Sequence, residues 1–229
     1  MLAAGHTRDA IAPVLPDHSM ACDLDPRESL GIVYPLLATL MRPKPITRRT
    51  VLLRRDALTA DERATASAAI AAAAVRLLGK LPADSIVALY APKGSEVDTK
   101  FVDDHARASG LRVVYPRIVG GAIQLAFHEV SVDELVPSTF ALREPLPSAP
   151  TVELAKIAAL LVPGLAFDRT GGRIGWGRGY YDATLVHAPA ALRIGLAFEC
   201  QLIDHVPRDP HDALLHYVVT EAAIYRAPD

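Results

Sequence analysis

The side chains most able to do chemistry gather in one stretch, residues 160–185, which reads LLVPGLAFDRTGGRIGWGRGYYDATL. A continuous apolar run, Ala158 to Val162, leads into it and stops at Pro163, as expected of a strand buried on both faces. Five glycines then stand too close together for a helix interior or a stable strand: Gly171, Gly172, Gly175, Gly177 and Gly179. Between and after them lie Arg173, Trp176, Arg178, Tyr180, Tyr181 and Asp182.

This mixture of residue types suits a phosphorylated ligand. Glycine lets backbone N–H groups approach an anion closely, and arginine offers planar, permanently charged donors that match phosphate oxygens. A carboxylate at the end of the loop, Asp182, could hold the magnesium that accompanies a nucleotide. The alternative is a flexible solvated linker, but linkers favour serine and threonine over tryptophan, tyrosine and arginine. We therefore predict a phosphate-binding loop.

Neither common nucleotide motif describes this loop. It lacks the P-loop spacing G-x-x-x-x-G-K-[ST], and it does not give G-x-G-x-x-G in the dinucleotide-binding manner. It resembles instead the signature of 5-formyltetrahydrofolate cyclo-ligases (methenyltetrahydrofolate synthetases), in which V-P-G-x-A-F-D is followed by R-[LI]-G-x-G-x-G-Y-Y-D. In this sequence the two elements are Val162–Asp168 and Arg173–Asp182, and the resemblance extends over about residues 44–221.

The resemblance implies an ATP-dependent enzyme that converts a reduced folate, 5-formyltetrahydrofolate, to 5,10-methenyltetrahydrofolate, with Mg2+ as cofactor. The formyl oxygen would attack the γ-phosphate, and a neighbouring nitrogen would then close the ring as phosphate leaves. Such chemistry asks the protein mainly for positioning and charge neutralisation. The implied catalytic residues are Arg173, Arg178 and Tyr181, and the implied ATP contacts in the loop are Arg173, Gly175, Gly177, Arg178, Gly179, Tyr180 and Tyr181.

A basic pair of the form K-x-x-x-R precedes the first long helix of that family, and Lys44 and Arg48 have this spacing. An ammonium and a guanidinium converging on a triphosphate are chemically reasonable, so the resemblance implies that both bind ATP. Without the resemblance, the basic residues of this region favour a solvated helix face: Arg42, Lys44, Arg48, Arg49, Arg54 and Arg55.

Glu96 lies after an expected strand and before an expected helix, the place where open α/β sheets bind ligands. A matching glutamate contacts folate in the family, so the resemblance implies a substrate site formed by Glu96, Trp176 and Tyr180. The alternative makes Glu96 only an acid in the first turn of a helix that Asp98 caps. Trp176 stands at a variable family position, which alters how the pterin or adenine is stacked. A basic residue that commonly follows the signature aspartate is replaced by Ala183.

Asp212, in the segment PRDPHDALLHYVVT, matches a magnesium-binding aspartate of the family, so the implied metal ligands are Asp182 and Asp212. A solvated acidic loop is the alternative, since Asp204 and Asp209 lie nearby. His211 and His216 are five residues apart, which is not a zinc spacing on a helix. We expect both to be structural, and four other histidines likewise have no partner evident from the sequence: His105, His128, His187 and His205.

Composition bounds the class of protein. The 229 residues suffice for one large domain with a substantial core, and 51% hydrophobic with 22% charged residues is ordinary for a globular chain. A formal net charge of -2 gives no electrostatic case for a nucleic-acid or membrane partner. Two distant cysteines, Cys22 and Cys200, form no C-x-x-C, and we expect Cys200 to be a buried small hydrophobe. Residues 1–43 show no targeting signal, so we expect a cytoplasmic protein with a partly ordered N-terminal extension.

The elements that must position these residues alternate regularly from residue 44 onward. Thr59 and Glu62 form a capping box that opens a helix to about Leu78. The other expected helices are 99–109 and 179–186, and the expected strands are 85–90, 111–115, 158–162, 193–198 and 217–220. Gly120–Gly121 predicts a hairpin turn between 113–119 and 122–130, and the segment 144–150, with three prolines, reads as a connection.

We therefore predict an α/β protein: a single three-layer α/β/α domain over 44–229, with a mostly parallel sheet and an antiparallel edge hairpin. Two other functions stay open. A phosphate-binding isomerase or acyl-transferase of the same broad fold would need a positioned base or nucleophile, and none stands out. A non-catalytic folate or nucleotide sensor would bind the ligands without turnover. Oligomeric state is not readable from the sequence.

Overall fold

A computed structural model describes residues 44–209 and 211–228, so the predicted extension over residues 1–43 lies outside the described residues. The fold is built on an eight-stranded sheet in the order β12-β11-β10-β7-β1-β2-β3-β6. Its strands are β1 (Ile86–Ala88), β2 (Arg112–Ile118), β3 (Leu125–Glu129), β6 (Thr151–Val152), β7 (Ile157–Val162), β10 (Leu192–Leu196), β11 (Tyr217–Val219) and β12 (Ile224–Arg226). The five strands from β11 to β2 run parallel, and β3, β6 and β12 add antiparallel edges. The predicted α/β class and mostly parallel sheet are confirmed.

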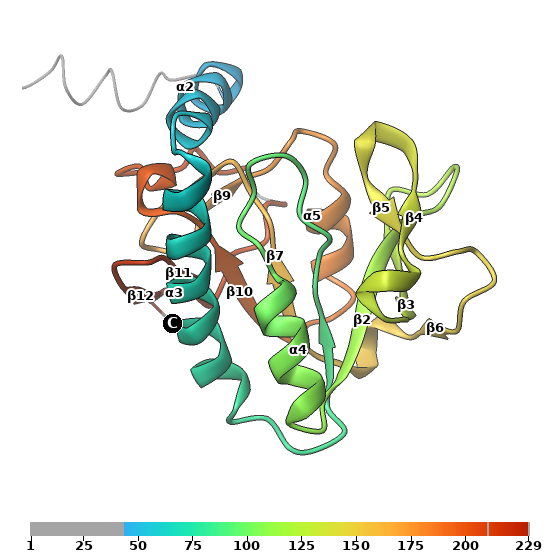
Figure 1. Ribbon diagram of the computed structural model, residues 1–229. Helices are drawn as coiled ribbons and strands as arrows, with labels where there is room; N and C mark the ends of the chain where they lie inside the picture. The colour runs from blue at the N-terminus through green and yellow to red at the C-terminus, as the bar shows by residue number, and fades with distance from the viewer. Residues whose placement is uncertain (1–43, 210, 229) are drawn as a thin grey trace, which may run out of the picture. The chain divides into compact units, whose positions relative to one another are not determined.

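Two helices cover one face of the sheet (Figure 1). Helix α3 (Ala60–Leu78) begins at the predicted capping box: Glu62 N–H donates to Thr59 Oγ1 at 3.2 Å, and Thr59 N–H donates to Glu62 Oε2 at 2.7 Å. Helix α4 (Lys100–Ala108) packs against α3. Asp98 Oδ1 accepts a hydrogen bond from Lys100 N–H at 2.9 Å, but the N-cap of α4 is Thr99, so the prediction of Asp98 as the cap is wrong by one residue.

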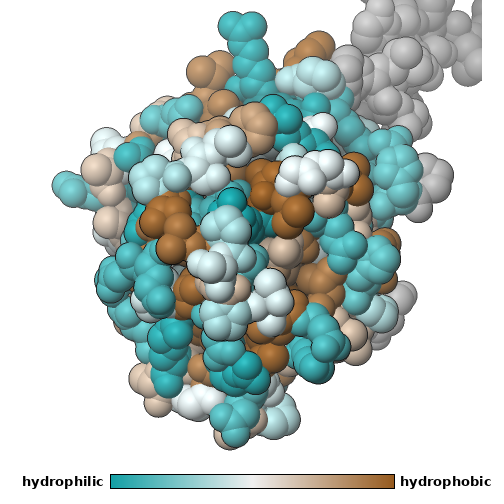
Figure 2. Space-filling model, turned by 90° about the vertical axis from the view of Figure 1, so that its right-hand side faces the viewer, coloured by the Kyte–Doolittle hydropathy of each residue, from teal (hydrophilic) through white to brown (hydrophobic). Residues whose placement is uncertain are grey.

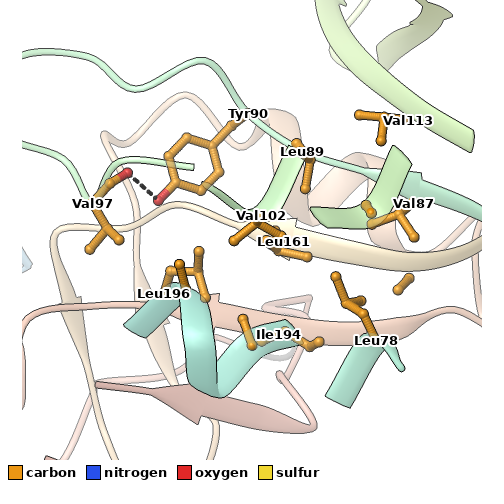
Figure 3. Close-up of a cluster of buried hydrophobic side chains, with 14 of the residues drawn as sticks. Leu78, Val87, Leu89, Tyr90, Val97, Val102, Val113, Leu161, Ile194 and Leu196 are labelled. Carbon is orange, nitrogen blue, oxygen red and sulfur yellow. Dashed lines mark hydrogen bonds between the residues drawn. The ribbon is translucent and has the colours of Figure 1, made fainter. Parts of the chain in front are cut away.

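The core beneath α3 and α4 follows from strand alternation, because every second side chain of a strand points to the same face. Leu161 and Ile194 from neighbouring strands pack there with Leu78 and Val102 from the helices (Figure 3). Tyr90 closes this core near the ligand side of the sheet, and its hydroxyl donates to the Val97 carbonyl at 3.1 Å.

The alternate side chains of the same strands form a second core on the opposite face. Leu160 and Val162 pack there against Leu185 of the short helix α5 (Tyr180–Leu185) and against Ala188 and Ala191. The third layer of the predicted sandwich is thus one short helix with the loop that follows it. Helix α2 (Lys44–Asp56) packs at the end of the sheet against β8 (Ala166–Phe167) and a 3₁₀ turn, η4 (Glu199–Gln201).

Several short elements are absent from the sequence-based expectations. They are the hairpins β4 (Val136–Pro137) with β5 (Arg143–Glu144) and β8 (Ala166–Phe167) with β9 (Arg173–Ile174), and the 3₁₀ turns η1 (Val132–Glu134), η2 (Thr139–Ala141) and η3 (Leu154–Lys156). The reading of residues 144–150 as connection is wrong at Glu144, which is a buried β5 residue. Glu144 accepts from Ile118 N–H at 3.0 Å and from Ser138 Oγ at 2.6 Å, which ties this hairpin to β2.

The surface on the side of β3 and β6 carries no broad apolar area: Figure 2 shows small brown areas scattered among teal ones. In the part of the chain that the structure describes, no helix has the length and apolar character to cross a bilayer.

Candidate functional site

A cavity of about 410 Å³ opens where parallel strands of the sheet end. Tyr90 and Ala91 enter it just after β1, Ile118 at the end of β2, and Pro163 just after β7. The carboxyl edge of a parallel sheet is the usual place for a ligand, because the loops that follow the strands converge there. All predicted site residues, from Lys44 to Asp212, lie on the wall of this cavity.

The glycine-rich loop forms one wall. Arg173 is the first residue of β9. Its side chain is only 5% exposed, and its Nη2 donates to Asp182 Oδ1 at 2.8 Å. Its guanidinium also lies 5.7 Å from the centre of the Tyr181 ring. Gly175 lies so close to this arginine that a Cβ there would be 2.7 Å from Arg173 Nη1. Gly179 has a φ of +72° where α5 begins, a backbone conformation that suits glycine. The loop therefore packs around its own cation.

Helix α2 supplies two further cations. Lys44 and Arg48 are four residues apart, so they share one face of the helix. Arg48 Nε donates to the Gly175 carbonyl at 2.9 Å. Gly177 has a φ of +90°, and a Cβ at this residue would lie only 3.2 Å from the Arg48 guanidinium, so glycine leaves room for the arginine. The alternative reading of a solvated basic face holds for the exposed Arg49 but is wrong for Arg55, which is 2% exposed.

Lys44 is joined to the C-terminal acidic segment. Its Nζ donates to Asp209 Oδ2 at 2.6 Å and to Asp212 Oδ2 at 2.8 Å. Burial alone would lower the pKa of Lys44, but these two carboxylates raise it above its ordinary value. Burial would likewise raise the pKa of Asp212, yet the Lys44 ammonium and the Asp209 N–H hold it below the usual range. Both groups are therefore charged at neutral pH.

Glu96 faces the loop across the cavity. Its Oε2 accepts from Lys93 N–H at 2.9 Å, and its Oε1 accepts from Trp176 Nε1 at 3.2 Å. Burial raises the pKa of Glu96, against the lowering effect of those two bonds and of the Arg55 and Lys93 charges. Burial, and then Glu96 itself, also raise the pKa of Tyr181, so that hydroxyl stays protonated.

The two predicted metal ligands, Asp182 and Asp212, both line the cavity, and each is paired with a cation from another element. Their carboxylate oxygens are the kind of ligand that magnesium prefers, so each side chain is chemically suited to hold such an ion. His211, which we expected to be structural, offers a ring nitrogen within 4.8 Å of carboxylate oxygens of Asp209 and Asp212.

Sequence reasoning missed four residues of the cavity wall. Phe140, Arg143 and Glu144 come from the β4–β5 hairpin, and Lys93 from the loop after β1. Arg178 lies over the Phe140 ring, 3.9 Å from its centre. No local signal marks these residues, because an isolated two-residue strand carries no periodicity. Phe140 and Ala141 both have positive φ, 59° and 56°, a strained conformation for residues with a Cβ and one that often occurs at functional sites.

Asp168, the last residue of the V-P-G-L-A-F-D element, lies away from the cavity wall and is fully buried. Its Oδ1 accepts from Thr170 N–H at 2.9 Å and Gly172 N–H at 2.8 Å, and its Oδ2 accepts from Val206 N–H at 2.9 Å. Arg208 Nη2 lies 3.2 Å from both oxygens. Burial would raise the pKa of Asp168, but these bonds together hold it below the ordinary value. Asp168 therefore fixes the β8–β9 turn to the segment that leads to Asp212.

The other polar candidates have structural partners. His128 is buried with its Nδ1 2.8 Å from the Ala149 carbonyl, and His216 Nδ1 accepts from Arg193 N–H at 3.0 Å. Cys200 is half-buried rather than buried, and burial raises the pKa of its thiol. These observations agree with the structural role expected for His216 and do not support a nucleophilic Cys200.

Comparison with known proteins gives a consistent result. The sequence model of the 5-formyltetrahydrofolate cyclo-ligase family matches residues 41–221. The 5-formyltetrahydrofolate cyclo-ligase of Mycolicibacterium smegmatis is 36% identical over 140 residues, which are 58% of this chain and 72% of that protein. The Escherichia coli K12 cyclo-ligase is 31% identical over 146 residues, 61% of this chain and 79% of its own.

Solved structures agree in fold. The 5,10-methenyltetrahydrofolate synthetase of Aquifex aeolicus superposes with a TM-score of 0.68 and 29% identity, covering 81% of this chain and 93% of that one. The 5,10-methenyltetrahydrofolate synthetase of Mycoplasma pneumoniae superposes with a TM-score of 0.66 and 25% identity, covering 79% of this chain and 99% of that one.

Proposed function

This chain belongs to the 5-formyltetrahydrofolate cyclo-ligase family, and on that premise we propose that its cavity converts 5-formyltetrahydrofolate to 5,10-methenyltetrahydrofolate at the expense of ATP, releasing ADP and phosphate. One observation carries the proposal. A basic helix face, the glycine-rich loop and a partly buried glutamate, from three distant parts of the sequence, line one cavity. A triphosphate and a reduced folate would therefore lie next to each other, as phosphoryl transfer between them requires.

The cations are proposed to hold the phosphates. Arg48, Arg173 and Arg178 offer guanidinium donors on the wall, and Lys44 offers an ammonium held in place by Asp212. These charges, with the loop N–H groups, would stabilise the negative charge that develops as the formyl oxygen attacks the γ-phosphate. Arg173, Arg178 and Tyr181 are the proposed catalytic residues, because they lie on the part of the loop that faces both ligands.

The folate is proposed to lie toward Glu96, with Trp176 and Tyr180 on the same wall. A carboxylate there accepts hydrogen bonds from the N–H groups of a pterin ring. The Lys93, Phe140 and Arg143 side chains close the cavity on that side. The chemistry requires no general base, and Tyr181, whose pKa is raised, stays protonated and can donate a hydrogen bond.

Asp182 and Asp212 are the residues proposed to hold magnesium. Bound there, the ion would neutralise phosphate charge and orient the triphosphate. Both carboxylates are held by cations of the site. Lys44 keeps Asp212 ionised, and Arg173 Nη2 fixes Asp182 Oδ1 at 2.8 Å.

The proposal is tested with Arg48→Met and its neighbour control Arg49→Met. Arg48 faces the loop, whereas Arg49 is exposed on the same helix and lies off the cavity wall. Loss of a charge-assisted hydrogen bond costs about 1.5–3 kcal/mol, so kcat/KM for ATP should fall roughly ten- to one-hundred-fold in Arg48→Met. Arg49→Met should match wild type. Equal losses in both variants would contradict the assignment, and binding of both ligands without a methenyl product would favour a sensor.

We also propose that residues 44–229 form the catalytic unit, in the cytoplasm, and that residues 1–43 are an extension. Removing residues 1–40 should spare product formation, whereas removing residues 1–48 should abolish it because Lys44 and Arg48 go with them. Circular dichroism of both proteins separates lost contacts from lost folding. Loss of activity in a folded protein that lacks only residues 1–40 would show that the extension belongs to the site.

A further inference from the structure

Trp176 is placed on the folate side of the cavity, but the proposed chemistry gives it no further role. It stands between Gly175 and Gly177 on the glycine-rich loop, its side chain is 47% exposed, and it lines the cavity. Its indole Nε1 donates to Glu96 Oε1 at 3.2 Å, long for a hydrogen bond to a carboxylate. A residue of the nucleotide loop thus holds the carboxylate proposed for the folate.

While this bond exists, the indole lies against one oxygen of Glu96, so a pterin ring that donates to this oxygen must share it with the indole or displace the indole. Glu96 Oε2 accepts from the backbone N–H of Lys93 at 2.9 Å. Its Oε1 is the oxygen that Trp176 occupies. Donors on a pterin ring would therefore compete with the indole N–H for Oε1. The indole can move, because it is half exposed and flanked by glycines, one of them at φ +90°.

The loop next to Trp176 is anchored by a residue proposed to bind phosphate. Arg48 Nε donates to the Gly175 carbonyl at 2.9 Å, and its guanidinium packs against Gly177. A triphosphate that draws the Arg48 guanidinium toward the nucleotide would weaken its Nε bond to Gly175 and so loosen the loop beside the indole. Arg48, Gly175, Trp176 and Glu96 thus form a continuous chain of contacts from the nucleotide side to the folate side.

The ring is held in its present place from the side of Glu96. Lys93 Nζ lies 5.2 Å and the Arg55 guanidinium 6.0 Å from the centre of the indole, both within reach of a cation–π interaction. Arg55 is itself buried and bonded through Nε to Ser95 Oγ at 2.9 Å. These contacts favour the state in which Trp176 covers Glu96 when no ligand is bound.

From this arrangement, and resting on the proposed function, we propose that Trp176 is a positioning residue that couples the two substrates. In the free protein the indole occupies Glu96 and lowers the affinity for folate. Nucleotide binding to the loop withdraws the indole, so folate binds more tightly to the nucleotide complex. By linkage, folate must strengthen nucleotide binding by the same factor.

The proposal predicts an unusual effect of Trp176→Phe, which keeps an aromatic ring and removes the donor. Both ligands should bind the free variant more tightly than the free wild type, by about three- to ten-fold, the range of one ordinary hydrogen bond. Each ligand should bind with unchanged affinity once the other is present. The coupling factor between them should fall toward one. A residue that merely contacts either ligand would instead lose affinity in every state.

Isothermal titration measures this directly. 5-Formyltetrahydrofolate is titrated into wild type and Trp176→Phe, each with and without magnesium and a non-hydrolysable ATP analogue, and the analogue is titrated likewise. A coupling factor equal to that of wild type, or weaker folate binding to the free variant, would overturn the proposal. Wild-type protein that binds neither ligand would instead refute the proposed function, so the two failures are distinguishable.

Fluorescence gives a second test that needs no variant, because Trp176 is the single tryptophan of the chain. Addition of the ATP analogue and magnesium alone should shift its emission, since the indole leaves Glu96, and the shift should be absent in Arg48→Met at saturating analogue. Unchanged emission in a wild-type sample shown by calorimetry to be saturated with nucleotide would overturn the proposal.

Discussion

Replacing Asp168 with asparagine removes one charge from the interior and keeps the shape of the side chain. In the native chain Oδ1 accepts from Thr170 and Gly172 N–H groups, and Oδ2 accepts from Val206 N–H. An asparagine must place its NH₂ against one of these sets of donors. The better choice keeps the carbonyl toward Thr170 and Gly172, and it leaves the buried Val206 N–H facing a second donor.

The magnitude follows from those contacts. One buried N–H without an acceptor costs about 1–3 kcal/mol, and the loss of the carboxylate charge weakens the bonds that remain, including the one from Arg208. We expect Asp168→Asn to lower the free energy of unfolding by about 2–4 kcal/mol at pH 7. Asp168→Ala should cost more, because all three backbone N–H groups then lose their acceptor.

The lowered pKa of Asp168 determines how its contribution to stability changes with pH. The folded-state pKa of Asp168 is lowered, so the ionised carboxylate stabilises the fold at every pH above its ordinary pKa of about 4. That stabilisation is lost as pH falls toward the lower, folded-state pKa. The difference in the free energy of unfolding between wild type and Asp168→Asn should therefore be constant from about pH 8 to 5 and become smaller below about pH 4.

Urea unfolding followed by circular dichroism at several pH values measures these differences. Thr139→Ser on the exposed η2 turn, a small change away from these contacts, serves as the control and should unfold like wild type. A stability of Asp168→Asn within about 0.5 kcal/mol of wild type at pH 7 would refute the reasoning that Asp168 is a structural link. A difference in the free energy of unfolding that increases as the pH falls would also refute it.

Three further outcomes are expected. Asp182→Asn and Asp212→Asn should both turn over slowly and need more magnesium while staying folded, and wild-type rates at limiting magnesium would show that the metal lies elsewhere. Arg173→Ala should weaken ATP by more than folate in separate calorimetric titrations, and the opposite order would reverse the roles of the two sides of the cavity. Ala141→Gly should raise the free energy of unfolding by about 0.5–1 kcal/mol because it relieves a positive φ, whereas Ala68→Gly inside α3 should lower it by about 1 kcal/mol. An Ala141→Gly variant that is no more stable than wild type in urea titrations would mean that residue 141 is not strained.

The sequence predicted those parts of the fold whose signal is local. The capping box at Thr59 and the apolar run of β7 each lie within a few adjacent residues, and both are where they were expected. The β8–β9 hairpin could not be found this way, because two-residue strands have no alternation and its turn depends on Asp168 bonds to Val206, far along the chain.

The site divides in the same manner. The glycine-rich loop and the K-x-x-x-R pair are contiguous patterns, so the residues implied by them, Arg48 and Arg173 among them, lie on the cavity wall. Phe140 and Lys93 reach it only through the packing of the β4–β5 hairpin and the loop after β1, which no spacing in the sequence encodes. Arg55 was misread because its charge suggested a solvated position, whereas it lies on the buried face of α2 with Thr47 and Val51 and donates from Nε to Ser95 Oγ.

The central claim is that one cavity couples ATP to closure of the folate ring, and the stoichiometry of the reaction tests it most directly. Purified protein is mixed with 5-formyltetrahydrofolate, ATP and magnesium, and methenyl product and ADP are measured in the same sample over time. We predict equal amounts of the two products, and no ADP when the folate is withheld. Methenyl product without ATP, or ADP formed at the same rate without folate, would contradict the account.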